Sequence, residues 1–140
     1  MTLSDRPTVV LADDHEGILK GVREILGDGF DIVATVRDGS KAVEAAIELQ
    51  PDILVLDIAM PELDGMRAAM EIKRLGICAK LVFLTVQEDY DYVQAADGMG
   101  ASYVLKARMH VDLPLAIREA LAGRRFVSPF SSLFFPTNLK

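Results

Sequence analysis

The sequence has one cysteine, Cys78, and no tryptophan. A single cysteine cannot form an internal disulfide, and it is not spaced with the two histidines like a zinc site. This cysteine usage favours a reducing compartment. No hydrophobic run reaches the roughly 18 residues that are needed to span a bilayer. The first ten residues do not resemble a secretory signal. We therefore expect a cytoplasmic protein that does not contact a membrane.

The sequence has fewer basic than acidic residues, 15 Lys and Arg against 21 Asp and Glu, and a formal net charge of -6. A protein surface that binds duplex DNA needs clustered basic side chains to replace the counterions of the phosphates. We therefore expect no direct contact between this chain and nucleic acid. Its 140 residues, of which 51% are hydrophobic, are enough for one domain with a single core.

Short apolar runs recur along the chain, and helical patterns separate them. The runs occupy residues 8–12, 31–36, 52–57, 80–85 and 101–106. Nearly all of their residues are apolar, which is typical of parallel strands covered by helices on both faces. Helices are predicted at about residues 15–27, 40–50, 63–75, 89–100 and 112–123. Asp112 is the expected N-cap of the last helix, and Ile47, Met70 and Leu121 fall within apolar helical stripes. Five strands alternating with five helices predict an α/β fold, a (βα)5 doubly wound parallel five-stranded sheet.

Polar side chains follow four of the predicted strands: Asp13 and Asp14, Asp57, Thr85, and Lys106. The carboxyl ends of parallel strands lie at one edge of the sheet, where doubly wound folds bind their ligands. Three carboxylates in one pocket repel one another, so their pKa values rise unless a cation keeps them ionised. The cluster therefore indicates a metal. A few oxygen ligands from protein suit Mg²⁺.

The remaining two side chains indicate the chemistry. Lys106 supplies a positive charge and Thr85 a hydroxyl donor, and together with a metal they are typical of phosphoryl transfer to a carboxylate, for which Asp57 is the candidate. Taken singly, each has an ordinary interpretation: acidic pairs are common in solvated turns, threonine is common in strands, and a strand-end lysine is commonly a solvated charge. Their arrival in order at the same end of separate strands favours the functional interpretation.

Four stretches resemble the response-regulator receiver domain of the CheY-like family over about residues 7–123. They are "VVLADDHE", "DILVLDIAMPELDG", "LVFLTV" and "GASYVLKA". The resemblance implies a flavodoxin-like sheet with strand order 2-1-3-4-5. It also implies that Asp57 accepts a phosphoryl group from a sensor histidine kinase in a reaction that needs Mg²⁺ or Mn²⁺. Such a domain is no enzyme beyond its own phosphorylation and autodephosphorylation.

The resemblance also implies roles for the neighbouring residues. Asp14 and Asp57 would ligate the metal directly, Asp13 directly or through water, and Ala59 through its backbone carbonyl. Lys106 would contact the phosphoryl oxygens.

Two further residues match the switch of the family. Thr85 would hydrogen-bond the phosphoryl group, and Tyr103 would turn inward as Thr85 moves. The surface of the fourth helix, fifth strand and fifth helix would then change, which favours control of a DNA-binding output and homodimer formation on phosphorylation. Without the resemblance, Tyr103 is interpreted as a half-buried strand aromatic.

Three positions depart from the commonest family pattern. Ala59 and Gln87 flank the expected path of the hydrolytic water, so we expect them to tune the phosphoryl lifetime. Ala107 stands where many receivers have proline, which leaves the geometry of the Lys106–Ala107 peptide open, because a cis bond before a non-proline residue costs about 2.5–4 kcal/mol.

We expect residues 1–123 to form the receiver and residues 124–140 a tail or linker without an output domain. "AGRRFVSP" resembles the junction after the receiver in LuxR-type and FixJ-like transcription regulators. The chain is then either an excised receiver or a single-domain regulator whose tail phenylalanines dock on a partner, namely Phe126, Phe130, Phe134 and Phe135. A third interpretation is a tail that packs by chance.

Two other function classes remain as alternatives. A Mg²⁺-dependent aspartyl-phosphate phosphatase would carry its nucleophile in a D-x-D motif after the first strand, whereas "LADDHE" has adjacent aspartates. A receiver that acts as an interaction module without phosphorylation would usually lack the acceptor, an acidic ligand or the lysine. All three are present.

Overall fold

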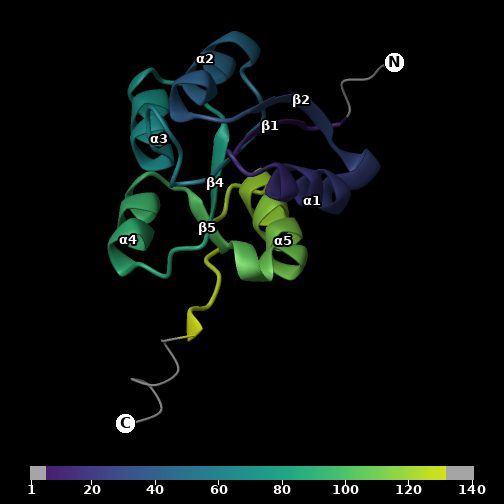
Figure 1. Ribbon diagram of the computed structural model, residues 1–140, viewed down its shortest axis with the longest axis vertical. Coiled ribbons are helices and arrows are strands. Elements are labelled where there is room, and N and C mark those ends of the chain that lie inside the picture. Colours follow the sequence, from purple (N-terminus) through teal and green to yellow (C-terminus); the bar gives the residue numbers. More distant parts are fainter. Residues whose placement is uncertain (1–5, 132–140) are drawn as a thin grey trace.

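The computed structural model describes residues 6–131, and Figure 1 shows their arrangement. Five strands form one parallel sheet in the order β2-β1-β3-β4-β5, namely β1 (Thr8–Ala12), β2 (Asp31–Val36), β3 (Ile53–Leu56), β4 (Lys80–Thr85) and β5 (Ser102–Leu105). The helices between them are α1 (Glu16–Leu26), α2 (Gly39–Leu49), α3 (Gly65–Arg74), α4 (Tyr90–Gly98) and α5 (Met109–Leu121). Two short 3-10 turns, η2 (Gly27–Gly29) and η3 (Lys106–Arg108), complete the order. The predicted (βα)5 fold and its strand order are confirmed.

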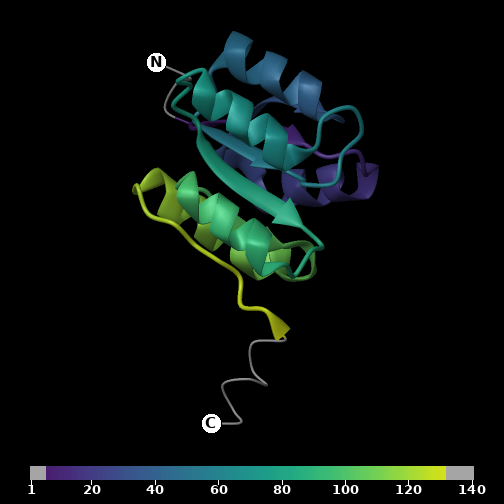
Figure 2. The ribbon, with the colours of Figure 1, turned by 90° about the vertical axis from the view of Figure 1, so that its left-hand side faces the viewer.

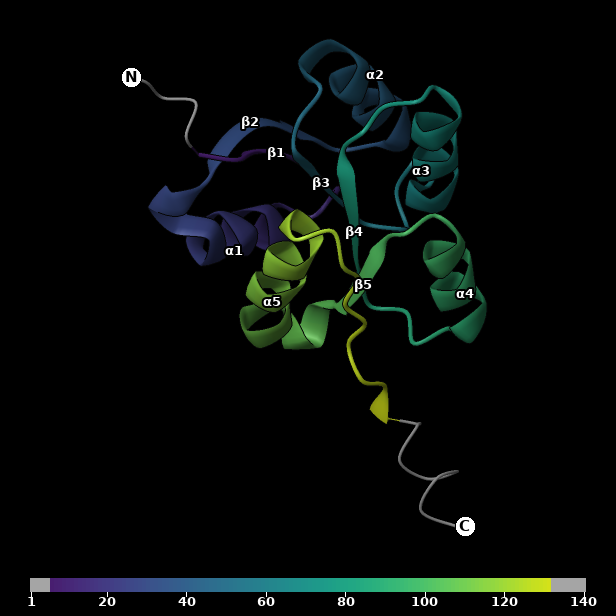
Figure 3. The ribbon, with the colours of Figure 1, turned by 180° about the vertical axis from the view of Figure 1, so that it is seen from behind.

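Helices cover both faces of the sheet. α1 and α5 lie on one face, and α2, α3 and α4 lie on the other, as Figures 1 and 3 show. Successive strand residues point to opposite faces, so Val9 and Leu11 pack with α1 and α5 whereas Val10 and Ala12 pack with the other layer. The continuous apolar runs in the sequence therefore follow from burial on two faces.

The last helix begins three residues before the predicted N-cap. α5 starts at Met109, directly after η3, and Asp112 lies inside it with a side chain 2% exposed. Its carboxylate accepts hydrogen bonds from Arg108 Nε at 2.6 Å and from Ser128 Oγ at 2.7 Å. The prediction of Asp112 as a cap is wrong because this carboxylate binds a segment 16 residues further along the chain.

Parts of the predicted inner helix faces were also wrong. Ile47, Met70 and Leu121 are 50%, 58% and 44% exposed. In α2 the buried hydrophobic side chains are alanines, at positions 42, 45 and 46, and Val43 is partly buried against the same core. Because small side chains let a helix lie close to the sheet, the larger Ile47 is left at the surface.

After α5 the chain turns back along β5, and Figure 2 shows this segment running beside α4. Val127 forms a parallel bridge with Tyr103 of β5. Phe130 is 2% exposed and packs within this chain, so it is not available to a partner in this structure. Phe134 and Phe135 lie outside the described residues. None of the helices within residues 6–131 combines the length and apolar character that crossing a bilayer requires.

Candidate functional site

Asp57 follows β3 directly and is held by backbone contacts. Its N–H donates to the Ala12 carbonyl at 2.8 Å, and its side chain is buried. The start of α3 approaches this point closely, because the Gly65 N–H donates to the Ile58 carbonyl at 2.8 Å. A Cβ atom on Gly65 would lie 1.9 Å from the Asp57 carbonyl oxygen, so only glycine fits there.

Lys106 faces two carboxylates from the end of β5. Its Nζ lies 3.2 Å from Asp57 Oδ2 and 2.8 Å from Asp13 Oδ2, and only 9% of its side chain is exposed. Burial raises the pKa of the Asp57 carboxyl, and the negative charge of Asp13 adds to this rise, whereas Lys106 opposes it. The lysine therefore only partly offsets the cost of ionising Asp57.

The acidic residues predicted from the sequence lie together. Asp13, Asp14 and Asp57 each offer a carboxylate oxygen, and these oxygens lie within 4.8 Å of one another and of a His15 ring nitrogen. Asp13 Oδ2 is buried and is paired with the Lys106 ammonium at 2.8 Å, the same ammonium that contacts Asp57. Clustered carboxylates that share a single ammonium fit a hard divalent cation.

His15 belongs to this cluster, although it is not among the site residues predicted from the sequence. Its Nδ1 lies 3.1 Å from both Asp13 Oδ1 and Asp14 Oδ1, and its backbone N–H donates to Asp13 Oδ1 at 2.8 Å. The signal that could have found it is its position directly after the acidic pair.

Three of the predicted switch and tuning residues are joined by hydrogen bonds, and the fourth contacts the acceptor. Thr85 is buried at the end of β4, and its Oγ1 accepts a hydrogen bond from the Gln87 N–H at 3.1 Å. Tyr103 is fully buried, and its hydroxyl donates to the Gln87 carbonyl at 2.7 Å. The Ala59 N–H donates to Asp57 Oδ1 at 3.4 Å, and the side chains of Ala59 and Gln87 are exposed. Tyr103 thus points inward and is bonded to the loop that follows Thr85.

Lys106 is the first residue of η3, and its peptide bond to Ala107 is trans. Two residues near this loop, Asp112 and Ser128, were not selected from the sequence as parts of any site. Their contact joins α5 to the segment after it, and no local sequence pattern signals such a contact.

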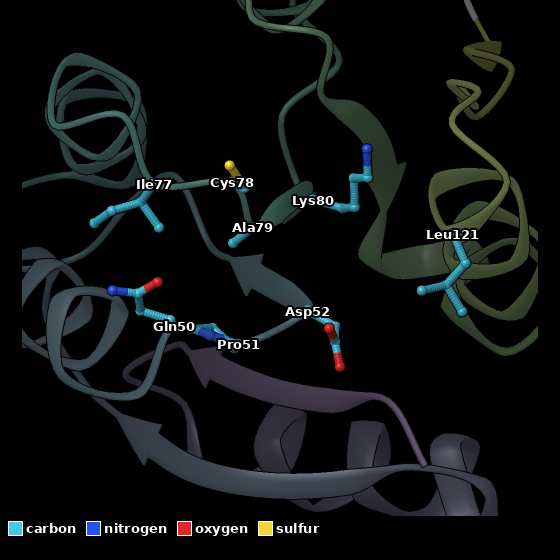
Figure 4. A pocket seen from close by; sticks show the side chains of 8 residues that line it. All are labelled: Gln50, Pro51, Asp52, Ile77, Cys78, Ala79, Lys80 and Leu121. Atoms are coloured by element: carbon cyan, nitrogen blue, oxygen red, sulfur yellow. The ribbon is translucent and has the colours of Figure 1, made fainter. Parts of the chain in front are cut away.

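A separate hollow of about 340 Å³ lies at the amino ends of β3 and β4 (Figure 4). Asp52 is the carboxylate among its lining residues, and it accepts hydrogen bonds from the N–H and hydroxyl of Thr8. This hollow is at the opposite end of the sheet from Asp57.

Comparisons with known proteins agree on one family. The family model of the response regulator receiver domain matches residues 9–117. The response regulator GacA of Pseudomonas viridiflava is 31% identical over 124 residues, which are 86% of this chain and 58% of GacA. The transcriptional regulatory protein LiaR of Bacillus subtilis is 35% identical over 118 residues, 82% of this chain and 56% of LiaR. The chain thus spans less than two thirds of these relatives.

Solved structures show the same fold. A two-component response regulator of the LuxR family from Aurantimonas sp. SI85-9A1 superposes with a TM-score of 0.84 at 29% identity, over 96% of this chain and 99% of that one. The receiver domain of RcsB from Salmonella enterica, determined with the phosphomimetic BeF₃⁻, gives 0.80 at 25% identity, over 89% and 94%. The chain therefore belongs to the response regulator receiver domain family of two-component signal transduction.

Proposed function

We propose that Asp57 accepts a phosphoryl group from a phosphohistidine of a sensor histidine kinase. The observation that supports this role is the buried Asp57 carboxylate at the end of β3, 3.2 Å from the Lys106 ammonium and beside Asp13. An oxygen of Asp57 attacks the phosphorus, the bond between phosphorus and the histidine nitrogen breaks, and the departing imidazole takes up a proton. The product is an aspartyl phosphate.

Asp13, Asp14, Asp57 and the backbone carbonyl of Ala59 would hold Mg²⁺ or Mn²⁺. When bound, the ion offsets the negative charge of the transferring phosphoryl oxygens. The crowding of these carboxylates, of which Asp13 and Asp57 share one ammonium, supports this assignment.

Lys106 and Thr85 would bind the phosphoryl group from the two neighbouring strands. Lys106 is held beside Asp57 before transfer and keeps its charge close to the new oxygens. Thr85 accepts from Gln87, which leaves its hydroxyl proton free to be donated to the phosphoryl group. A movement of Thr85 toward the phosphoryl group would shift the Gln87 backbone and, with it, the acceptor of the Tyr103 hydroxyl. The surface of α4, β5 and α5 would change as Tyr103 adjusts.

The downstream partner is proposed from the relatives. LiaR is a transcriptional regulatory protein, and one solved structure contains RcsB dimers bound to DNA. We expect this receiver to control a DNA-binding output, in the same polypeptide or in a partner, through a phosphorylation-dependent homodimer. The alternative is a receiver that binds its partner without phosphorylation.

Intact mass after incubation with acetyl phosphate and Mg²⁺ tests the acceptor. Wild type should gain one phosphoryl group, and Asp57→Asn should gain none. Asp28→Asn is the matched control, because Asp28 is exposed in η2 and should leave the adduct unchanged. A wild-type chain without an adduct would support the phosphorylation-independent alternative.

A further inference from the structure

Residues 124–131, which we call the strap, lie along the free edge of β5 (Figures 2 and 3). The Tyr103 N–H donates to the Phe126 carbonyl at 2.9 Å, and the Ser128 N–H donates to the Tyr103 carbonyl at 2.8 Å. An edge strand otherwise presents backbone groups without partners. The strap thus acts as a short sixth strand that satisfies both backbone groups of Tyr103.

Ser128 anchors the strap through its side chain. It is 1% exposed, and its Oγ accepts from the Leu105 N–H at 3.1 Å and donates to Asp112 Oδ2 at 2.7 Å. Asp112 also accepts from Arg108 Nε. Undocking would deprive a buried N–H and a buried carboxylate of their Ser128 partner, a cost that favours the docked strap.

Phe130 packs the far end of the strap against two tyrosines. Its ring centroid lies 6.0 Å from that of Tyr103 and 5.7 Å from that of Tyr90. Phe130 and Tyr103 are both buried, so the two rings exclude water from one another. The docked strap therefore covers the inward position of Tyr103.

The strap is connected to the groups that face Asp57 by two short routes. The first route begins at Ser128, whose Oγ accepts from the Leu105 N–H; the next residue is Lys106, whose ammonium contacts Asp57. The second route begins at Phe130, whose ring packs on Tyr103. The Tyr103 hydroxyl donates to the Gln87 carbonyl, and the Gln87 N–H donates to the Thr85 hydroxyl oxygen. The strap thus contacts the backbone next to Lys106 and, through Tyr103 and Gln87, the loop residue that is bonded to Thr85.

We propose that strap docking and occupation of the phosphoryl position on Asp57 stabilise one another. Donors that are already fixed bind an oxyanion more tightly than donors that must first be ordered, so a docked strap favours the phosphorylated site. Because coupling between two sites is reciprocal, phosphorylation tightens the strap by the same factor. This inference rests on the proposed role of Asp57.

Hydrogen exchange of the Ser128 amide in the full 140-residue chain measures docking. With Mg²⁺ and BeF₃⁻, a mimic of the phosphoryl group, we expect wild-type exchange at Ser128 to slow at least about five-fold. Ser128→Ala should weaken BeF₃⁻ binding by a matching factor, whereas Ser40→Ala, at an exposed position of α2, should not. Phe130→Leu keeps an apolar side chain at that position and tests the second route if Ser128→Ala does not fold.

The two proposals fail differently in this experiment. If the amides of Asp57 and Ala59 respond to BeF₃⁻ while Ser128 exchange stays unchanged, the strap proposal is overturned and the acceptor role of Asp57 stands. If those amides do not respond at all, the acceptor role is overturned, and the coupling with it.

Discussion

The hydroxyl of Tyr103 donates a hydrogen bond of 2.7 Å to the carbonyl of Gln87. The N–H of the same Gln87 donates to the Thr85 hydroxyl oxygen at 3.1 Å. The backbone of one loop residue thus joins the end of β4 to the buried aromatic side chain of β5. A displacement of Thr85 toward a phosphoryl group would move Gln87 and with it the partner of Tyr103.

Tyr103→Phe removes this hydrogen bond and keeps the ring. We expect the free energy of unfolding, measured by urea denaturation, to fall by about 1 kcal/mol, because the Gln87 carbonyl loses its donor. Tyr90→Phe is the control, since Tyr90 is exposed and keeps its ring contact with Phe130, and should change stability by less than about 0.5 kcal/mol. Equal effects of the two substitutions would contradict a special role for the Tyr103 hydroxyl.

Ala59→Met tests the proposed control of phosphoryl lifetime. The Ala59 side chain is exposed and its N–H contacts Asp57, so a larger side chain there narrows the approach of water to the acceptor. We expect the autodephosphorylation rate, followed by loss of the phosphoryl mass, to change several-fold. Ala95→Met, at an exposed position of α4, should leave the rate as it is. If Ala59→Met loses its phosphoryl group at the wild-type rate, Ala59 does not tune the phosphoryl lifetime.

The sheet and the acidic cluster could be predicted because their signals are local. Each strand is a short apolar run, and Asp13, Asp57 and Lys106 each follow such a run directly. Once parallel strands are inferred, their ends meet at one edge, so the convergence of these side chains follows without knowledge of any contact.

The start of α5 and the strap could not be predicted because their causes are not local. Asp112 resembles a cap in sequence, yet its carboxylate is held by Ser128, 16 residues later. The residues of the strap have no strand period, since a single parallel bridge at Val127 needs none. Ile47 was misplaced because hydrophobicity alone does not decide which side of α2 faces the sheet, and the side that does so carries Ala42, Ala45 and Ala46.

Gly65→Ala should disturb the acceptor strand. A Cβ atom there would overlap the Asp57 carbonyl oxygen, so the start of α3 must move away from β3. We expect a lower melting temperature and weaker Mg²⁺ binding, measured by calorimetry. Gly17→Ala is the matched control, because nothing lies within 4 Å of its added Cβ and alanine favours the α1 helix by roughly 0.5–1 kcal/mol. A wild-type melting temperature in Gly65→Ala would show that α3 can shift without cost.

Asp57→Asn should stabilise the metal-free protein in a manner that depends on pH. Burial raises the pKa of the Asp57 carboxyl above its unfolded value of 3.8, so the folded chain keeps this proton to higher pH than the unfolded chain. Wild-type stability therefore falls, relative to the asparagine variant, as pH rises from the unfolded pKa through the raised folded pKa. At pH 7 without metal, we expect the variant to melt at least roughly 2 °C higher, and below about pH 4 the difference should vanish.

Magnesium should stabilise wild type more than Asp57→Asn at pH 7. The ionised Asp57 is proposed to bind the cation with Asp13 and Asp14, so Mg²⁺ should raise the melting temperature of wild type more than that of Asp57→Asn. Thermal melts of both proteins with and without Mg²⁺, at pH 4 and pH 7, separate the two effects. If Asp57→Asn gains nothing at pH 7 without metal, Lys106 alone compensates the buried charge, and the acidic cluster imposes no cost for a cation to relieve.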